Sequence, residues 1–173
     1  MRVDFSAWHV RHGFAARRFS YSKLSGNARD FDLEVHFDIQ AGLSVVTTVS
    51  FLFSDLELTS QQALTAVLRP LNGVGKHYQV DMIGGPAARG VAMTAIGSES
   101  NLNALSAFRE GKDLELELRA SDGELLAKLP LPNNLEFRSV YSEASQGIEP
   151  VDIFSLIEQR PQGLLSRVKN FFR

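Results

Sequence analysis

The chain has 173 residues, 44% of them hydrophobic, which is enough apolar material for one domain, and its lack of cysteine excludes disulfides, thiolate metal sites and a cysteine nucleophile. Its net charge of −2 hides a partition: residues 1–29 carry six basic side chains against one acidic, residues 30–158 carry eight against nineteen, and residues 160–173 carry four and no carboxylate. The partition predicts a basic aromatic N-terminal arm (1–29), a β-rich core domain (30–150) and a C-terminal helical tail (151–173).

The N-terminal arm interleaves basic and aromatic side chains, which is typical of an interaction surface. The candidates for contact with a partner are Trp8, Arg11, Phe14, Arg17 and Arg18. Nucleic acid is not the expected partner, because the whole chain is negative. His9 and His12 have helical spacing, but their neighbours favour a packed aromatic segment over a metal site.

The clearest local pattern is the strict alternation of apolar and polar residues from Phe31 to Ile39, which predicts a half-buried strand. Gly42 supplies a turn, and Leu43 to Phe53 predicts a second strand, so the two are expected to form a hairpin. The polar face of the first strand carries Asp32, Glu34, His36 and Asp38. This face is ordinarily solvated surface; the alternative is a cation or small-ligand site, with Glu34, His36 and Asp38 as metal ligands.

Two helices are expected between the hairpins. Thr59 to Gln62 has the form of a capping box and predicts a helix that ends at Pro70. The second helix is expected over Glu99–Arg109, with Ser98 or Ser100 as its N-terminal cap and Gly111 after its last turn.

Further strands are predicted on either side of the second helix. They are expected at 78–83 and 91–96, at 114–118 and 125–131 with a turn at 121–123, and at 137–141. Runs of strands with few helices predict a mostly β (α+β) domain: an antiparallel β-sandwich or jelly-roll-like fold with two short helices and a C-terminal amphipathic helix.

Catalytic and cofactor motifs are not found. Gly73–Lys76 and Gly84–Pro86 lack the phosphate-loop and dinucleotide spacings and are interpreted as hairpin turns. No serine lies in a nucleophile elbow, and no cofactor is expected. The chain also lacks an apolar run of about eighteen residues and a secretory leader pattern, which favours a cytoplasmic location.

The C-terminal residues predict a short amphipathic helix after Pro161 and Gly163. Its candidate interaction residues are Leu164, Leu165, Arg167, Val168, Lys169, Phe171, Phe172 and Arg173. Such a helix suits a groove on a partner or an anionic membrane surface, and it would equally suit docking on its own domain. Both interpretations stay open, because so short a helix needs some surface to order it.

A string of features from Arg89 to Leu131 resembles the C-terminal half of invasion-associated locus B proteins, which are small bacterial β-sandwich proteins. The matching text is Gly90-Val91-Ala92, Asn103 to Lys112, the strand 114–118, Asp122-Gly123 and Leu129-Pro130-Leu131. The resemblance covers about a quarter of the chain, and the family's cysteines and signal peptide are missing. It implies a β-sandwich and no site residues.

Taken together, these patterns predict a non-catalytic interaction or structural protein whose basic, amphipathic termini dock onto protein partners or its own copies. A subunit of a bacterial or viral assembly fits this description. The alternative is a β-sandwich that binds a small ligand or cation, or acts as an enzyme, through the polar face of strand 31–39.

Overall fold

The computed structural model describes residues 1–11, 13–22, 30–40 and 46–145. These residues form ten β-strands and two α-helices. In chain order they are β1 (Arg2–Phe5), β2 (His9–Arg11), β3 (Phe14–Ser22), β4 (Phe31–Gln40), β5 (Val46–Phe53), β6 (Gln62–Pro70), β7 (Tyr78–Pro86), β8 (Val91–Ala95), α1 (Gly97–Arg109), β9 (Leu114–Ala120), β10 (Leu125–Leu131) and α2 (Phe137–Ser145).

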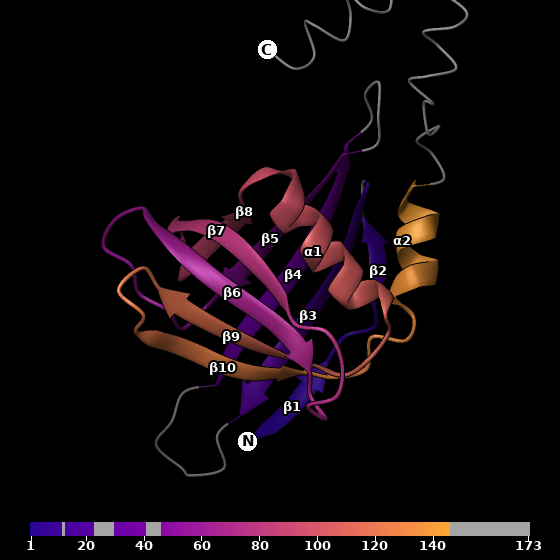
Figure 1. The fold of residues 1–173 in the computed structure, drawn as a ribbon, viewed down its shortest axis with the longest axis horizontal. Helices are drawn as coiled ribbons and strands as arrows, with labels where there is room; N and C mark the ends of the chain where they lie inside the picture. Colours follow the sequence, from indigo (N-terminus) through magenta and orange to yellow (C-terminus); the bar gives the residue numbers. More distant parts are fainter. Residues whose placement is uncertain (12, 23–29, 41–45, 146–173) are drawn as a thin grey trace, which may run out of the picture.

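All ten strands belong to one antiparallel sheet in the order β1-β3-β4-β5-β8-β7-β6-β9-β10, with β2 beside β3. The sheet curls until it is nearly closed (Figure 1), and Tyr21 of β3 donates to the Pro130 carbonyl of β10 (2.8 Å) across the closure. The predicted mostly β class is therefore confirmed. The strands are joined into one continuous sheet, whereas a sandwich would divide them between two.

Both predicted hairpins are present. β4 pairs with β5, and the apolar residues of β4 at positions 31, 33, 35, 37 and 39 are at most 7% exposed. β9 pairs with β10 across a turn in which Gly123 has a φ of +89°. In both hairpins the period of two places one set of side chains in the core and the other on the outer face.

The prediction of a helix that ends at Pro70 is wrong, because residues 62–70 form strand β6. Leu64, Ala66 and Leu68 are buried, while Thr65 and Val67 between them are partly exposed. Leu64 and Leu68 are four residues apart, a spacing that places both side chains on one face of a helix and also on one face of a strand. Pairing with β7 on one side and β9 on the other decides between the two.

The predicted helix over 99–109 is confirmed as α1, and Gly111 follows it with a φ of +70°. Its expected serine cap is wrong: no side chain caps the helix, and the Ser100 hydroxyl accepts a hydrogen bond from the Asp81 amide (2.9 Å). The strand predicted at 137–141 is also wrong, since helix α2 begins at Phe137.

Gly73 to Lys76 forms the expected hairpin turn between β6 and β7, but Gly84 to Pro86 does not form a turn. These residues continue strand β7, and the turn to β8 is closed by the Ala87 amide bonding to the Gly90 carbonyl (3.0 Å). A side chain at Gly84 would lie 2.5 Å from Leu64 Cδ1, so the missing Cβ permits close packing of β7 on its neighbours.

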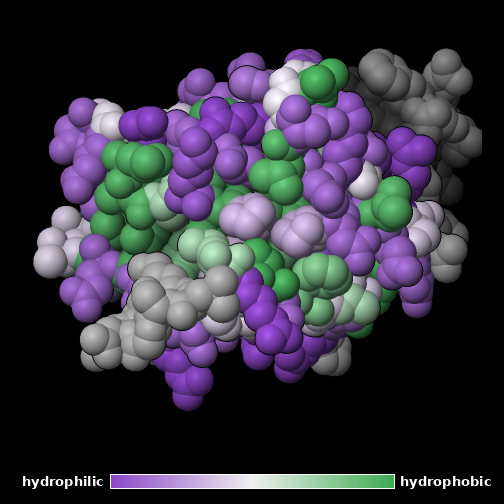
Figure 2. Space-filling view, turned by 90° about the horizontal axis from the view of Figure 1, so that it is seen from below, coloured by the Kyte–Doolittle hydropathy of each residue, from purple (hydrophilic) through white to green (hydrophobic). Residues whose placement is uncertain are grey.

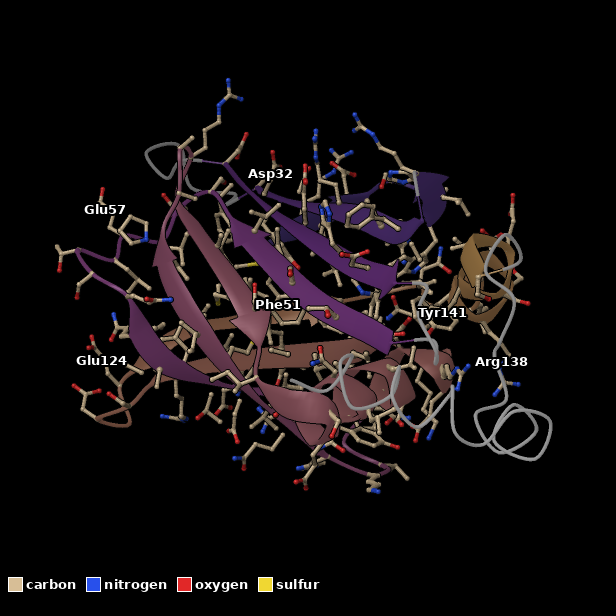
Figure 3. All side chains as sticks on the ribbon, turned by 90° about the horizontal axis from the view of Figure 1, so that it is seen from above. Asp32, Phe51, Glu57, Glu124, Arg138 and Tyr141 are labelled. Atoms are coloured by element: carbon tan, nitrogen blue, oxygen red, sulfur yellow. The ribbon has the colours of Figure 1, made fainter. Side chains whose placement is uncertain are left out.

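An aromatic cluster joins both helices to the inner face of the sheet. Trp8 contacts Phe37 of β4, Phe108 of α1 and Phe137 of α2, with ring centroids 4.8 to 6.1 Å apart. Figure 3 shows Phe51 within the curled sheet, whereas Glu57 and Glu124 lie at its periphery. The core is thus enclosed by the sheet and covered by α1 and α2.

The first 22 residues belong to this sheet, although the sequence suggests a separate arm. β1 pairs with one half of β3, β2 pairs with the other half, and β3 pairs along its length with β4. Trp8 is 5% exposed and Arg17 is 2% exposed, so both are core side chains.

Exposed apolar side chains are spread over the surface. The face in Figure 2 carries groups of hydrophobic residues divided by hydrophilic ones. Neither helix in the described part of the chain is long and apolar enough to cross a membrane.

Candidate functional site

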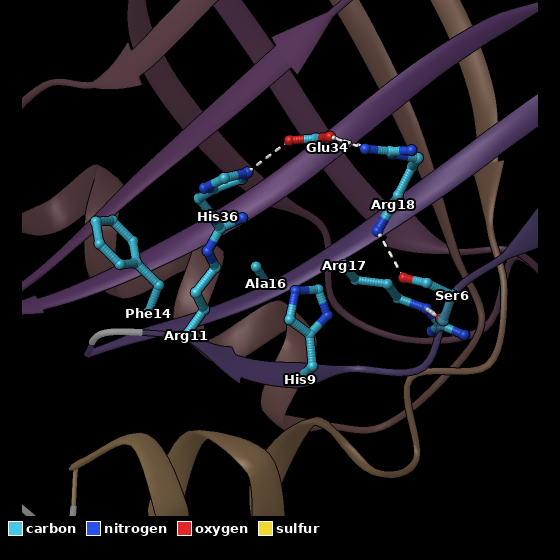
Figure 4. Close-up of a pocket in the computed structure, with 9 residues that line it drawn as sticks. All are labelled: Ser6, His9, Arg11, Phe14, Ala16, Arg17, Arg18, Glu34 and His36. Atoms are coloured by element: carbon cyan, nitrogen blue, oxygen red, sulfur yellow. Dashed lines mark hydrogen bonds and ion pairs between the residues drawn. The ribbon is translucent and has the colours of Figure 1, made fainter.

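A hollow of about 350 Å³ lies on the outer face of strands β2, β3 and β4, and Figure 4 shows its lining. We call it the Ala16 pocket. Its lining residues are Ser6, His9, Arg11, Phe14, Ala16, Arg17, Arg18, Glu34 and His36.

The pocket exists because Ala16 is small and its neighbours are large. In the strand register, Ala16 lies between His9 of β2 and His36 of β4. Adjacent strands are about 4.8 Å apart, so the two histidine side chains rise about 10 Å from each other with only a methyl group between them. Phe14 and Arg18, two positions away on either side of Ala16, close the remaining walls.

The turn at Gly13 places strand β2 beside β3 in the sheet. Gly13 has a φ of +82°, which a glycine adopts without strain, and its carbonyl accepts a hydrogen bond from the Ile39 amide (3.1 Å). The chain then reverses, and the period of two puts His9 and Arg11 on the same side as Phe14 and Ala16.

Glu34 is the one carboxylate in the lining, and both of its oxygens are engaged. Arg18 donates to Oε1 through Nε (3.1 Å) and Nη2 (2.7 Å), and His36 Nε2 donates to Oε2 (3.0 Å). Partial burial raises the pKa of Glu34, but the hydrogen bonds from His36 and Arg18 outweigh it and hold this pKa below its ordinary value. Glu34 is therefore ionised near neutral pH.

Arg11 is the cation of the pocket that remains available to a ligand. It is exposed and forms no ion pair with any residue in the described ranges. His9 Nδ1 donates to the Ala7 carbonyl (3.3 Å), which leaves Nε2 of this ring without a hydrogen-bond partner among the described residues. The guanidinium of Arg17 is bonded on the inner side of the sheet and the charge of Arg18 is balanced by Glu34, so Arg11 leaves the rim with a net charge of +1 when the histidines are neutral.

Phe14 adds an apolar wall. Its ring meets the His36 ring edge to face, with centroids 6.1 Å apart. The pocket therefore combines an aromatic wall, a methyl floor and a cationic rim, which suits a ligand that has an acidic group and a short apolar stem.

No family model, curated protein or solved structure matches this chain. The resemblance of residues 89–131 to invasion-associated locus B proteins therefore stays a prediction. The candidate function rests on the geometry of the site.

The structure brings together two sets of residues that the sequence suggested separately. Arg11, Phe14 and Arg18 of the N-terminal set line the Ala16 pocket beside Glu34 and His36 of strand 31–39. Trp8 of the first set is buried in the aromatic cluster instead, and the guanidinium of Arg17 is bonded to backbone carbonyls.

The proposed metal ligands are only partly gathered. Asp38 lies opposite Phe14 in the register and outside the lining, and the described residues hold no group of three acidic or histidine side chains that could bind a metal ion. The eight C-terminal interaction residues, Leu164 to Arg173, lie outside the described residues.

Ser6, His9 and Ala16 are the lining residues that sequence reasoning missed. An alanine has no chemistry of its own to attract notice, and His9 was considered at helical spacing with His12. The alternation of His9, Arg11, Phe14 and Ala16 around Gly13 is the signal that could have indicated a short hairpin with one polar face.

A larger hollow of about 660 Å³ lies over β7 and β8. Its lining residues are Gln61, Ile83, Gly85, Pro86, Ala92, Thr94, Ala95, Ile96 and Gly97. None of them is charged, so this hollow offers no group that would select a ligand by charge. The Ala16 pocket is the stronger candidate because its donors converge.

Proposed function

We propose that this chain is a non-catalytic interaction protein that binds an acidic segment of a partner protein in the Ala16 pocket. The observation that carries the proposal is the cationic rim of the hollow: its single carboxylate, Glu34, is already bonded to Arg18 and His36, and Arg11 faces the opening unpaired by described residues.

The chemistry of the rim favours a carboxylate. A guanidinium presents parallel N–H donors that match the two oxygens of a carboxylate, and such charge-assisted bonds are stronger than neutral ones. Arg18 already binds a carboxylate at the edge of the pocket, where two of its N–H groups donate to Oε1 of Glu34. We infer that Arg11 does the same for an aspartate, a glutamate or a C-terminal carboxylate of the partner.

The pocket lining contains one hydroxyl group, that of Ser6, and its hydrogen bonds favour a binding role over a catalytic one. The Ser6 hydroxyl donates to the Ala7 carbonyl (3.2 Å) and accepts from the Arg18 amide (3.0 Å). No lining histidine bonds to it in the described structure, which is the contact that an activated serine requires.

The test is the fluorescence anisotropy of a labelled tetraglutamate peptide titrated with the protein at low ionic strength. Ala16→Ile fills the hollow without changing the charge, and Arg11→Gln removes the anchor. Each should weaken binding about tenfold, as expected for the loss of about 1.4 kcal/mol. Matched controls are Ala63→Ile, at an exposed strand position, and Arg89→Gln, in an exposed turn.

Both controls should bind the peptide like the wild type. If the wild type does not bind tetraglutamate, or if Arg89→Gln weakens binding as much as Arg11→Gln, the proposal is wrong. Equal effects of Arg89→Gln and Arg11→Gln would mean that the peptide is attracted by any surface arginine and not specifically by Arg11.

A second candidate function is the binding of a small free carboxylate. It is favoured by the volume of about 350 Å³, which lies at the lower end of small-molecule pockets, and by the wall of Phe14 and His36. If benzoate displaces the labelled peptide completely, both ligands use this pocket. Binding of benzoate without binding of any acidic peptide would favour the small ligand.

The predicted C-terminal helix, self-association and a cytoplasmic location are parts of the proposal that rest on the sequence alone. The basic residues of the helix would contact the acidic partner at a second place. Such a second contact would raise the overall affinity by keeping the acidic segment near the pocket.

A further inference from the structure

Glu34 has an unusual position for a binding site that attracts anions. It lies on β4 directly opposite Arg18 of β3 and two residues before His36, and its side chain is 31% exposed. Figure 4 shows its carboxylate between these two side chains at the edge of the Ala16 pocket. The pocket thus holds a carboxylate of its own.

This internal carboxylate changes what the pocket offers to a ligand. Three donor atoms, Nε and Nη2 of Arg18 and Nε2 of His36, already bond to Glu34. The charge of Arg18 is compensated, and Arg11 is left as the one uncompensated cation at the rim in the described part of the chain. Arg11 can therefore balance one negative charge on the ligand. A second negative charge would have no cation to pair with and would lie near the Glu34 carboxylate.

We infer that Glu34 is the specificity-determining residue of the Ala16 pocket, and that it makes the pocket select singly charged carboxylates over doubly charged phosphates. The inference rests on the proposed function. Its physical basis is that repulsion scales with the product of the charges, so a dianion is repelled by Glu34 twice as strongly as a monoanion.

The experiment compares benzoate with phenyl phosphate, which share a ring and differ in charge. Binding is measured by isothermal titration calorimetry at about pH 8 and low ionic strength, where a phosphate monoester with a second pKa of about 6 is a dianion. The wild type should bind benzoate more tightly. Glu34→Gln should tighten benzoate binding about fivefold and phenyl phosphate binding about 25-fold, because the free energies of repulsion differ by a factor of two.

Asp32→Asn is the matched control. Asp32 lies on the same strand and the same outer face, and it does not line the pocket. This variant should leave the ratio of the two affinities unchanged. Thermal melting of both variants checks that each is folded, and both substitutions are on the outer face of the sheet.

The outcomes separate the two claims. If the wild type binds neither probe, the inference fails, and the proposed function fails with it only if tetraglutamate does not bind either. If the wild type binds benzoate and Glu34→Gln changes both affinities by the same factor, the role of Glu34 is overturned while the proposed function stands. A shift with Asp32→Asn as large as that with Glu34→Gln would also overturn it.

Discussion

Arg17 joins the two ends of the curled sheet. Its guanidinium is buried on the inner side of β3 and donates to the carbonyls of Ser6 (2.8 Å), Pro132 (3.0 Å) and Asn133, and to Asn134 Oδ1 (3.3 Å). Burial lowers its pKa to about 10, so it is still charged near neutral pH. The bonds tie the N-terminal strands to the loop that follows β10.

Arg17→Met should lower the free energy of unfolding by about 3 kcal/mol. The substitution keeps an unbranched apolar stem, but it leaves the partly buried carbonyl groups and buried Asn134 without this donor, and each such loss is costly. Arg18→Met is the control, because it removes an exposed ion pair worth less than about 1 kcal/mol. Urea denaturation of both variants measures the difference, and equal losses would contradict this account of Arg17.

At the scale of the elements, Gly90 fixes the turn between β7 and β8. It has a φ of +86°, and a Cβ there would lie 1.9 Å from the carbonyl oxygen of Phe53. Gly90→Ala should therefore cost about 3 kcal/mol or more, from backbone strain and a clash with backbone.

Gly123→Ala separates the two causes, because Gly123 has a similar φ of +89° and nothing within 4 Å of the added Cβ. It should cost only about 1 kcal/mol, the strain alone. Thermal unfolding measures both. If the two variants are equally stable, the contact with Phe53 does not constrain the turn.

The outer face of β6, β9 and β10 carries a network of ion pairs whose effect depends on pH. Glu117 accepts hydrogen bonds from Arg119 (2.7 Å) and Arg69 (3.0 Å), and the bond from Arg119 is the largest cause that holds the pKa of Glu117 below its ordinary value of 4.5.

A carboxylate whose pKa is lowered by folding contributes stability above its unfolded pKa and loses that contribution as the pH falls through its folded pKa. The free energy of unfolding of the wild type should therefore decrease on acidification below about pH 4.5, and Glu117→Gln should decrease less steeply. Urea denaturation over this range tests the prediction; identical slopes would contradict it.

The elements also show what the sequence could and could not predict. The strands β4 and β9 follow strict alternation, and turn residues separate β9 from β10, so these strands were predicted with their pairings. Residues 62–70 were not, since Leu64, Val67 and Leu68 fit a helix, and only the neighbouring strands favour the extended form. Phe137 and Tyr141 fit both periods in the same way, and their burial against Trp8 and α1 accompanies the helical form.

For the molecule as a whole, the site could be predicted only in pieces. Arg11, Phe14 and Arg18 stood out as basic and aromatic residues, and Glu34 and His36 as a polar strand face. These two groups of residues come together only because β3 pairs with β4 in one particular register. The two strands are separated by a segment of the chain, and local sequence patterns do not specify the register of such a pair. Charge partition separated an N-terminal arm from the body, whereas these residues complete the sheet.

The central claim, that the Ala16 pocket holds the acidic ligand, is tested most directly by a titration of isotope-labelled protein with tetraglutamate, followed through its backbone amide resonances. The account predicts saturable shifts concentrated at residues 9–11, 14–18 and 34–36, and their loss in Ala16→Ile. Shifts centred on the uncharged hollow over β7 and β8, or no saturable shifts, would contradict it.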